Sequence, residues 1–248
     1  MSEELDHLEI LPVKKVEEKD TKKGTLKLNP ILPGATEAGG LKPFLLVIQA
    51  PVRSGKTNLI INLLYNQHFS YKKFYEEIIY ISPTIENDDT GKAIMKDEDI
   101  VKITERLDSL DLILESIVEI QKEKLKEDRN HTLIVLDDCL GLIRTLGQSY
   151  FSTLCSKYRH WRISLWITTQ NFRALPPTCR YNATSYIIFR TNNRKELTKM
   201  EEEFEGNFPF FEIYTMATKE KYNFLYLNME EIQGFRNFKE LIYQKYSN

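Results

Sequence analysis

The chain has 248 residues, and its 34 Lys and Arg against 36 Asp and Glu give a formal net charge of -2. This balance excludes a polycation that binds nucleic acid through its overall field, so any contact with DNA must use a local basic patch. Hydrophobic residues make up 42% and charged residues 28% of the sequence, as in globular proteins that bury a core.

The three cysteines and four histidines show no metal-site spacing, which favours a reducing compartment without structural zinc. The first ten residues, MSEELDHLEI, are acidic and contain no apolar segment of signal-peptide length. The longest apolar run is only long enough for a strand. We therefore expect a cytoplasmic chain that is not secreted and does not contact a membrane.

Residues 1–40 are charged and then rich in Pro and Gly. They predict an N-terminal arm with little core of its own, which either carries a short strand or is disordered. From Phe44 onward, strand-like and helix-like segments alternate. Short apolar runs predict strands at 44–50, 76–84, 131–138, 163–170, 184–190 and 222–229. Apolar spacing and position predict helices from Thr57, around 103–127, around 149–160 and near 194–204.

This alternation predicts an α/β fold, with a mostly parallel sheet flanked by helices on both faces. We expect residues 41–229 to form one domain, and residues 230–248 to form an amphipathic C-terminal helical tail after Gly234. Ligands of such sheets bind at the carboxyl ends of the strands. The segments 50–57, 137–138 and 169–170 all fall there.

The first of these segments, APVRSGKT, matches the phosphate-loop pattern G-x-x-x-x-G-K-[ST] except at its first position. Such a loop curls backbone N–H groups round phosphates, while its lysine reaches the terminal phosphates and its hydroxyl holds Mg²⁺. A strand before it and a helix after it supply the right context. The predicted nucleotide-binding residues are Ala50, Pro51, Val52, Arg53, Ser54, Gly55, Lys56, Thr57 and Asn58.

Alanine replaces glycine at position 50, and the next residue is Pro51. A residue before proline adopts extended backbone angles, which alanine tolerates. Glycine would be essential only if this position required a positive φ. We therefore expect the loop to form, against the alternative of a chance SGKT in a surface turn.

The segment TLIVLDDC ends an apolar strand with Asp137 and Asp138. In phosphoryl-transfer sites one acid holds Mg²⁺ and a second orients the attacking water. We assign Asp137 and Thr57 to the metal and Asp138 to the water, although aspartate reaches less far than glutamate. Thr169 and Gln170 end another strand, where an amide could sense the γ-phosphate. The alternative for each pair is a polar strand end.

Together, APVRSGKT, LIVLDD, KYRHWRIS with LWITTQNFRALPPTCRYNA, and ATKEKYNFLYLN resemble the genome-packaging ATPases of poxviruses, other large DNA viruses and virophages. These belong to the FtsK–HerA group of P-loop ATPases, and the resemblance covers roughly residues 41–229. It implies a RecA-like P-loop NTPase fold (the ASCE class) in which another strand separates the loop strand from the acidic strand. It also implies ATP hydrolysis with Mg²⁺, using Lys56, Asp137, Asp138 and Gln170.

The resemblance further implies a homo-oligomeric ring, pentameric or hexameric, that pumps double-stranded DNA into a preformed capsid in the virion or a cytoplasmic virus factory. A neighbouring subunit of such a ring donates an arginine to the γ-phosphate. Arg159 is our first candidate, with Arg162 and Arg180 as alternatives. Contacts with capsid proteins are expected, and the segment GLIRTLGQS at 141–149 is a candidate DNA contact through Arg144. Two other functions stay open: a different P-loop DNA motor, such as a helicase or segregation ATPase, and a nucleotide-binding adaptor without hydrolysis.

Overall fold

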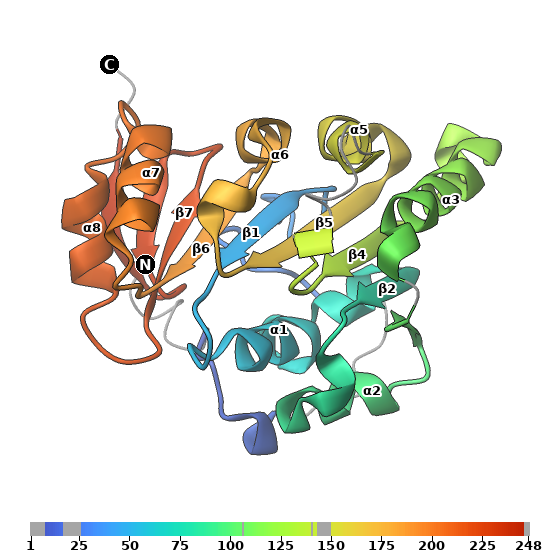
Figure 1. The fold of residues 1–248 in the computed structure, drawn as a ribbon, viewed down its shortest axis with the longest axis horizontal. Helices are drawn as coiled ribbons and strands as arrows, with labels where there is room; N and C mark the ends of the chain where they lie inside the picture. The colour runs from blue at the N-terminus through green and yellow to red at the C-terminus, as the bar shows by residue number, and fades with distance from the viewer. Residues whose placement is uncertain (1–7, 17–25, 106, 140, 143–149, 246–248) are drawn as a thin grey trace.

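The computed structural model describes residues 8–16, 26–105, 107–139, 141–142 and 150–245. Within these residues nine strands form one sheet in the order β3-β2-β4-β5-β1-β6-β7-β8-β9 (Figure 1). The strands from β3 to β6 in this order are parallel, and β7, β8 and β9 are antiparallel. Their bounds are β1 (Leu45–Gln49), β2 (Glu77–Ile81), β3 (Ile100–Ile103), β4 (Thr132–Leu136), β5 (Ile163–Thr169), β6 (Ser185–Phe189), β7 (Phe224–Asn228), β8 (Gln233–Arg236) and β9 (Glu240–Gln244).

Helices cover both faces of the sheet, which confirms the predicted α/β class. They are α1 (Lys56–Tyr65), α2 (Lys92–Lys96), α3 (Leu110–Glu123), α5 (Tyr150–Lys157), α6 (Pro177–Asn182), α7 (Arg194–Phe204) and α8 (Phe210–Ala217). In Figure 1, α1 and α2 lie on one side of the parallel strands and α3, α5 and α6 on the other. Successive strand residues face opposite cores: Leu46 and Ile48 pack with α1, whereas Leu45 and Val47 pack with α3 and α5.

The six predicted strands are confirmed, and β5 lies between β1 and β4, as the resemblance implied. The helix predicted from residue 103 begins later, at Leu110. Ile103, which we had assigned to it, ends the edge strand β3. Ile100 is buried while Val101 is 50% exposed, so β3 has the alternation of an edge strand covered on one face.

The predicted C-terminal helical tail is wrong. Its described residues form β8 and β9, which extend the sheet beyond β7. Phe235 and Phe238 are 2% and 0% exposed, so this segment contributes to the core. The spacing of its apolar residues suits a helix, but pairing with the free edge of β7 overrides that local preference.

The described residues of the N-terminal arm pack on the face of the sheet that carries α1. Leu8, Leu28 and Leu32 are at most 2% exposed and belong to the same hydrophobic cluster as α1. A short 3-10 helix, η1 (Val13–Lys15), follows the first of these leucines. Among the described residues, no helix has the length and apolar character needed to cross a membrane.

A first prediction concerns the C-terminal strands. Phe238→Ala should lower the free energy of unfolding by about 3–5 kcal/mol, because the ring is fully buried against Phe69, Phe224 and Tyr226. Urea denaturation measures the effect. The matched control, Phe211→Ala, truncates a ring that is 41% exposed and should cost much less. Equal losses for the two variants would contradict the packing of this segment.

A second prediction concerns the pH dependence of stability. His131 lies just before β4, 3% exposed, with its ring against Tyr75. Burial, and then the charge of Arg162, lower the pKa of His131 to about 4, although Glu76 opposes them. The unfolded chain therefore takes up this proton near pH 6.5 and the folded chain only near pH 4. As the pH is lowered from 6.5 to 4, the free energy of unfolding should therefore decrease. His131 should account for on the order of 3 kcal/mol of this loss.

Urea denaturation at pH 7 and pH 4 tests this prediction on the wild type and His131→Gln, which cannot take up the proton. The difference between the two pH values should be smaller in the variant. Equal differences would show that His131 does not cause the loss.

Candidate functional site

The predicted phosphate loop connects β1 to α1 at the carboxyl end of the sheet. The backbone N–H of Ala50 donates to Thr169 O at 2.8 Å and so continues the strand. Arg53 and Gly55 have positive φ angles of 62° and 98°, and they turn the chain into α1 at Lys56. Gly55 therefore occupies a conformation that favours glycine. Ala50 has no positive φ, so the glycine missing at this position is not required by the backbone.

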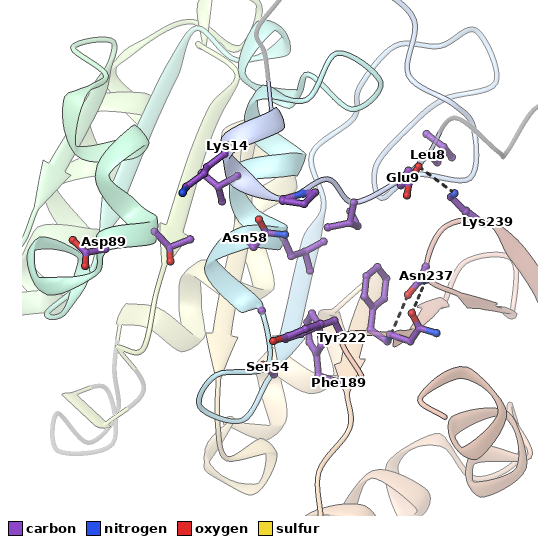
Figure 2. Close-up of a pocket in the computed structure, with 18 residues that line it drawn as sticks. Leu8, Glu9, Lys14, Ser54, Asn58, Asp89, Phe189, Tyr222, Asn237 and Lys239 are labelled. Carbon is purple, nitrogen blue, oxygen red and sulfur yellow. Dashed lines mark hydrogen bonds and ion pairs between the residues drawn. The ribbon is translucent and has the colours of Figure 1, made fainter. Parts of the chain in front are cut away.

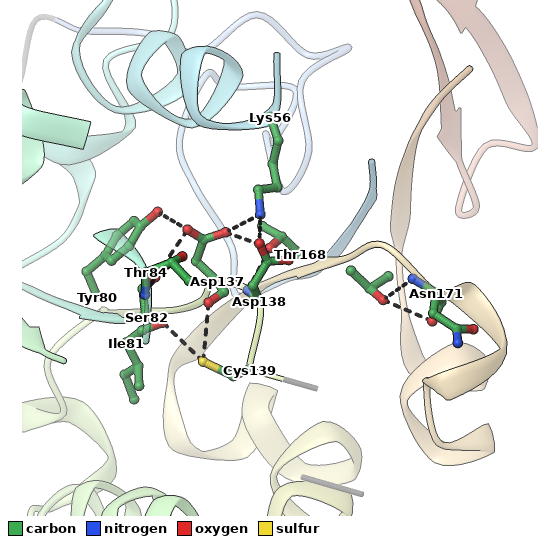
Figure 3. Close-up of polar contacts among 11 residues, drawn as sticks. Lys56, Tyr80, Ile81, Ser82, Thr84, Asp137, Asp138, Cys139, Thr168 and Asn171 are labelled. Carbon is green, nitrogen blue, oxygen red and sulfur yellow. Dashed lines mark hydrogen bonds and ion pairs between the residues drawn. The ribbon is translucent and has the colours of Figure 1, made fainter. Parts of the chain in front are cut away.

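Lys56 extends from the first turn of α1 to the two predicted acids (Figure 3). Its Nζ lies 3.0 Å from Asp137 Oδ1 and also pairs with Asp138 Oδ2. The Lys56 side chain is only 14% exposed. Burial acts to lower the pKa of Lys56, but the two carboxylates outweigh it and raise that pKa above its ordinary value. Lys56 is thus a fully charged group where the loop meets α1.

Asp137 is held from several sides. Thr168 Oγ1 donates to its Oδ1 at 2.7 Å, and Tyr80 Oη donates to its Oδ2 at 3.0 Å. The residue is 3% exposed. Burial, and then the charge of Asp137, raise the pKa of Tyr80 well above its ordinary value, so its phenol stays protonated and donates. A buried carboxylate needs such partners, and here they fix its orientation.

Asp138 adopts a φ of 56°, a left-handed conformation that is uncommon for a residue other than glycine. Its backbone N–H donates to Thr168 Oγ1 at 3.0 Å. Thr168 therefore contacts both acids: it donates to one side chain and accepts from the backbone of the other. The turn redirects the chain after β4 and brings the shorter aspartate side chain to Lys56.

Gln170 follows β5 and is exposed. It lines a hollow of about 230 Å³ together with Asp138 and Thr168. Thr169 is buried, and its Oγ1 donates to Asn171 O at 2.9 Å. Gln170 thus borders the same hollow as Asp138, whereas the hydroxyl of Thr169 bonds within its own turn.

The residues predicted to hold Mg²⁺ supply suitable ligands. The Thr57 hydroxyl and the Asp137 carboxylate are hard oxygen ligands, which Mg²⁺ takes together with substrate phosphates and water. Among the described residues, no three His, Cys, Asp or Glu side chains gather to form a metal site.

The candidate arginines lie away from this site. Arg159 is exposed in the 3-10 helix η7 (Tyr158–Trp161), just before β5, so it lies at the amino end of the parallel strands, whereas Lys56 lies at their carboxyl end. Arg162 donates to Arg129 O at 2.8 Å. Arg180 lies in α6 and pairs with Glu203 at 2.7 Å in a nearly buried contact. Arg144 lies outside the described residues.

The sequence analysis missed Thr168, Tyr80 and Ser82, all of which contact Asp137. We singled out Thr169 and Gln170 because they end the strand. The alternation within β5 could have identified Thr168, because Trp166 packs on the α1 face and the residue two positions on shares that face.

The comparisons with known proteins agree with this architecture. The family model described as "Poxvirus A32 protein" matches residues 39–205. An uncharacterized protein, 075L of Invertebrate iridescent virus 6, is 28% identical over 82 residues, or 33% of this chain. That match spans about a third of the relative's length, 32%.

Among solved structures, B204, the DNA-packaging ATPase from Sulfolobus turreted icosahedral virus, has a TM-score of 0.56 at 18% identity over 84% of this chain and 100% of its own. The B204 genome packaging NTPase of Sulfolobus turreted icosahedral virus 2, in complex with AMP, has a TM-score of 0.57 at 16% identity over 78% and 96%. The pCW3 conjugation coupling protein TcpA gives 0.52 at 16% identity over 87% and 67%. These likenesses show the P-loop NTPase fold.

The family match covers most of the predicted domain, including the phosphate loop, the acidic pair and the polar end of β5. The chain therefore belongs to the poxvirus A32 protein family.

Proposed function

We propose that this chain is an ATPase that uses ATP hydrolysis to move double-stranded DNA into a preformed capsid. The observation that carries the proposal is the position of Lys56 between Asp137 and Asp138 at the carboxyl end of the sheet. Family membership supports it, as does the likeness in fold to B204, a DNA-packaging ATPase. A lysine, a hydroxyl and two acids round one loop are the groups that phosphoryl transfer needs.

In this proposal the phosphates lie along residues 50–58, whose backbone N–H groups and helix N-terminus attract anions. Lys56 turns from its two carboxylates to the terminal phosphates. Thr57 and Asp137 would hold Mg²⁺, which would supply positive charge against the charge that builds up on the phosphates. Asp138, released from Lys56, accepts a hydrogen bond from the attacking water. Gln170 borders the same hollow and responds to the loss of the γ-phosphate.

The proposal includes assembly into a ring of five or six copies. Arg159 lies at the amino end of the parallel strands and Lys56 at their carboxyl end. Arg159 would therefore serve a neighbour's site and not its own. Its guanidinium lies 5.4 Å from the ring centroid of Tyr158, which holds it near the surface. The candidate partners are DNA and capsid proteins, in a virion or a cytoplasmic virus factory.

A third prediction tests the motor. The wild type should hydrolyse ATP, with a several-fold higher rate when double-stranded DNA is added, and Lys56→Ala should lose at least 100-fold in rate. A phosphate-release assay with and without DNA measures the rate, and native mass spectrometry measures the ring. Greater stimulation by single strands would indicate a helicase. Binding without any turnover would indicate the adaptor, and turnover that survives Lys56→Ala would overturn the assignment of the site.

A fourth prediction separates binding from chemistry. Asp138→Asn should lower kcat by about 100- to 10,000-fold, the usual contribution of a general base. ATP should bind at least as tightly as to the wild type, because Lys56 loses one of the carboxylates that compete with phosphate. Titration with a fluorescent ATP analogue and single-turnover kinetics measure the two effects. The control, Asp128→Asn, changes an exposed acid that precedes β4 at the amino end of the strands. It should alter neither kcat nor ATP binding. A kcat within threefold of the wild type would exclude Asp138 as the base.

A further inference from the structure

A cavity of about 820 Å³ adjoins the phosphate loop (Figure 2), and its lining residues do not include Asp137 or Asp138. Ser54, Gly55 and Asn58 form its wall on the loop and on α1. Tyr222 and Phe189, from the chain before β7 and from β6, line the cavity next to the loop. The N-terminal segment 8–14 closes the remaining side. The cavity therefore opens onto the first turn of α1, where a phosphate chain would end.

The N-terminal segment is fixed to α1 by three asparagines spaced four residues apart. Asn62 accepts from Leu11 N at 2.8 Å and donates to Leu11 O at 2.8 Å. Asn58 also donates to Leu11 O, at 3.1 Å, and Asn66 donates to Glu9 O at 3.1 Å. The spacing places all three on one side of the helix. They bind backbone atoms and so fix the path of this segment along α1, while the buried Leu8 adds apolar packing.

Two features of the cavity wall call for a ligand. The Ser54 hydroxyl is buried and has no hydrogen-bond partner among the described residues, although buried polar atoms are normally paired. Tyr222 is 59% exposed and has a φ of 70°, and strain of this kind gathers at binding sites. A Cβ added at Gly55 would lie 3.5 Å from Tyr222 Cδ1, so the ring stands directly beside the loop.

We propose that this cavity binds the purine nucleoside part of the nucleotide, with Tyr222 stacking on the base and the N-terminal segment 8–14 serving as a wall. The proposal rests on the proposed function, because the phosphates must lie in the loop. The volume falls in the range of about 300–1,000 Å³ that is usual for small-molecule sites. Apolar and aromatic walls with a few amides also suit a base and a ribose.

A consequence follows for the N-terminal segment. A ligand that contacts the segment only when it is docked must stabilise the docked state, and docking must strengthen binding by the same factor. Nucleotide occupancy therefore controls how firmly residues 8–14 are held on α1. Inorganic tripolyphosphate, which fills the loop alone, has no such effect.

The test compares two probes on the full chain by isothermal titration calorimetry: the non-hydrolysable analogue AMPPCP and inorganic tripolyphosphate. Tyr222→Ala should weaken AMPPCP binding about tenfold, as for the loss of one base–aromatic stack, and leave tripolyphosphate binding unchanged. Tyr222→Phe keeps the ring and should bind both probes like the wild type. Tyr181→Ala, which removes an exposed tyrosine on α6, should also change neither.

The wall is tested by Leu8→Ala, which loosens the N-terminal segment without altering α1 or the loop. It should weaken AMPPCP binding several-fold and spare tripolyphosphate. Leu32→Ala truncates an equally buried leucine of the same hydrophobic cluster outside the cavity and should spare both probes. In hydrogen exchange, AMPPCP should protect the amides of residues 9–13 about tenfold more than tripolyphosphate does.

The outcomes separate this inference from the proposed function. If neither probe binds, or if Lys56→Ala leaves the binding of both intact, the loop is not a phosphate site and both proposals are overturned. If both probes bind equally tightly and Tyr222→Ala affects neither, only the nucleoside pocket is overturned. If Leu8→Ala and Leu32→Ala weaken AMPPCP equally, the N-terminal segment is not part of the wall.

Discussion

The charge of Lys56 is compensated by two carboxylates that come from a strand two places away in the sheet. Most of the site depends on this contact. A lysine that is 14% exposed cannot stay charged without partners, and an acid that is 3% exposed needs donors as well. Because β5 lies between β1 and β4, Thr168 on β5 can reach the acids that follow β4. It donates to the carboxylate of Asp137 and accepts from the backbone N–H of Asp138. The strand order thus provides the spacing, and the threonine fixes the orientation.

Much of the parallel core could be predicted from the sequence, because each buried strand appears as a short apolar run and each motif lies at the end of one. β1 and β4 are buried at every position, and runs of this kind have few alternative structures. The edges were harder to predict. β3 is short and half exposed, and the apolar spacing of 230–245 fits a helix as well as strands. Residues 230–245 form strands and not a helix because they pair with the free edge of β7, which is a tertiary feature that the local sequence does not show.

The residues of the site likewise fall into two groups, those that the sequence could predict and those that it could not. Lys56, Asp137 and Asp138 belong to local motifs, and the structure brings them together as expected. Tyr80 and Thr168 carry no motif, since their role follows from the register Leu136↔Ile167 and from the faces of neighbouring strands. Asn62 of α1 was also overlooked. It is buried, 0% exposed, inside an apolar helix, and its pairing with a distant backbone explains this local anomaly.

The segments that we expected to be appendages therefore belong to the domain's architecture. The N-terminal segment lies along α1 next to the loop, and β8 continues the sheet from β7, the strand that follows Tyr222. Asn237, just after β8, accepts from the backbone N–H of Phe224 at 3.1 Å and so ties the two strands together beside the cavity. The N-terminal segment 8–14 and Asn237 thus both line the cavity beside the phosphate loop, whereas the two acids pair with Lys56. A nucleotide in the loop would place its phosphates at Lys56 and its base against these two segments, so one ligand would connect the chemistry to parts of the chain that we expected to be appendages.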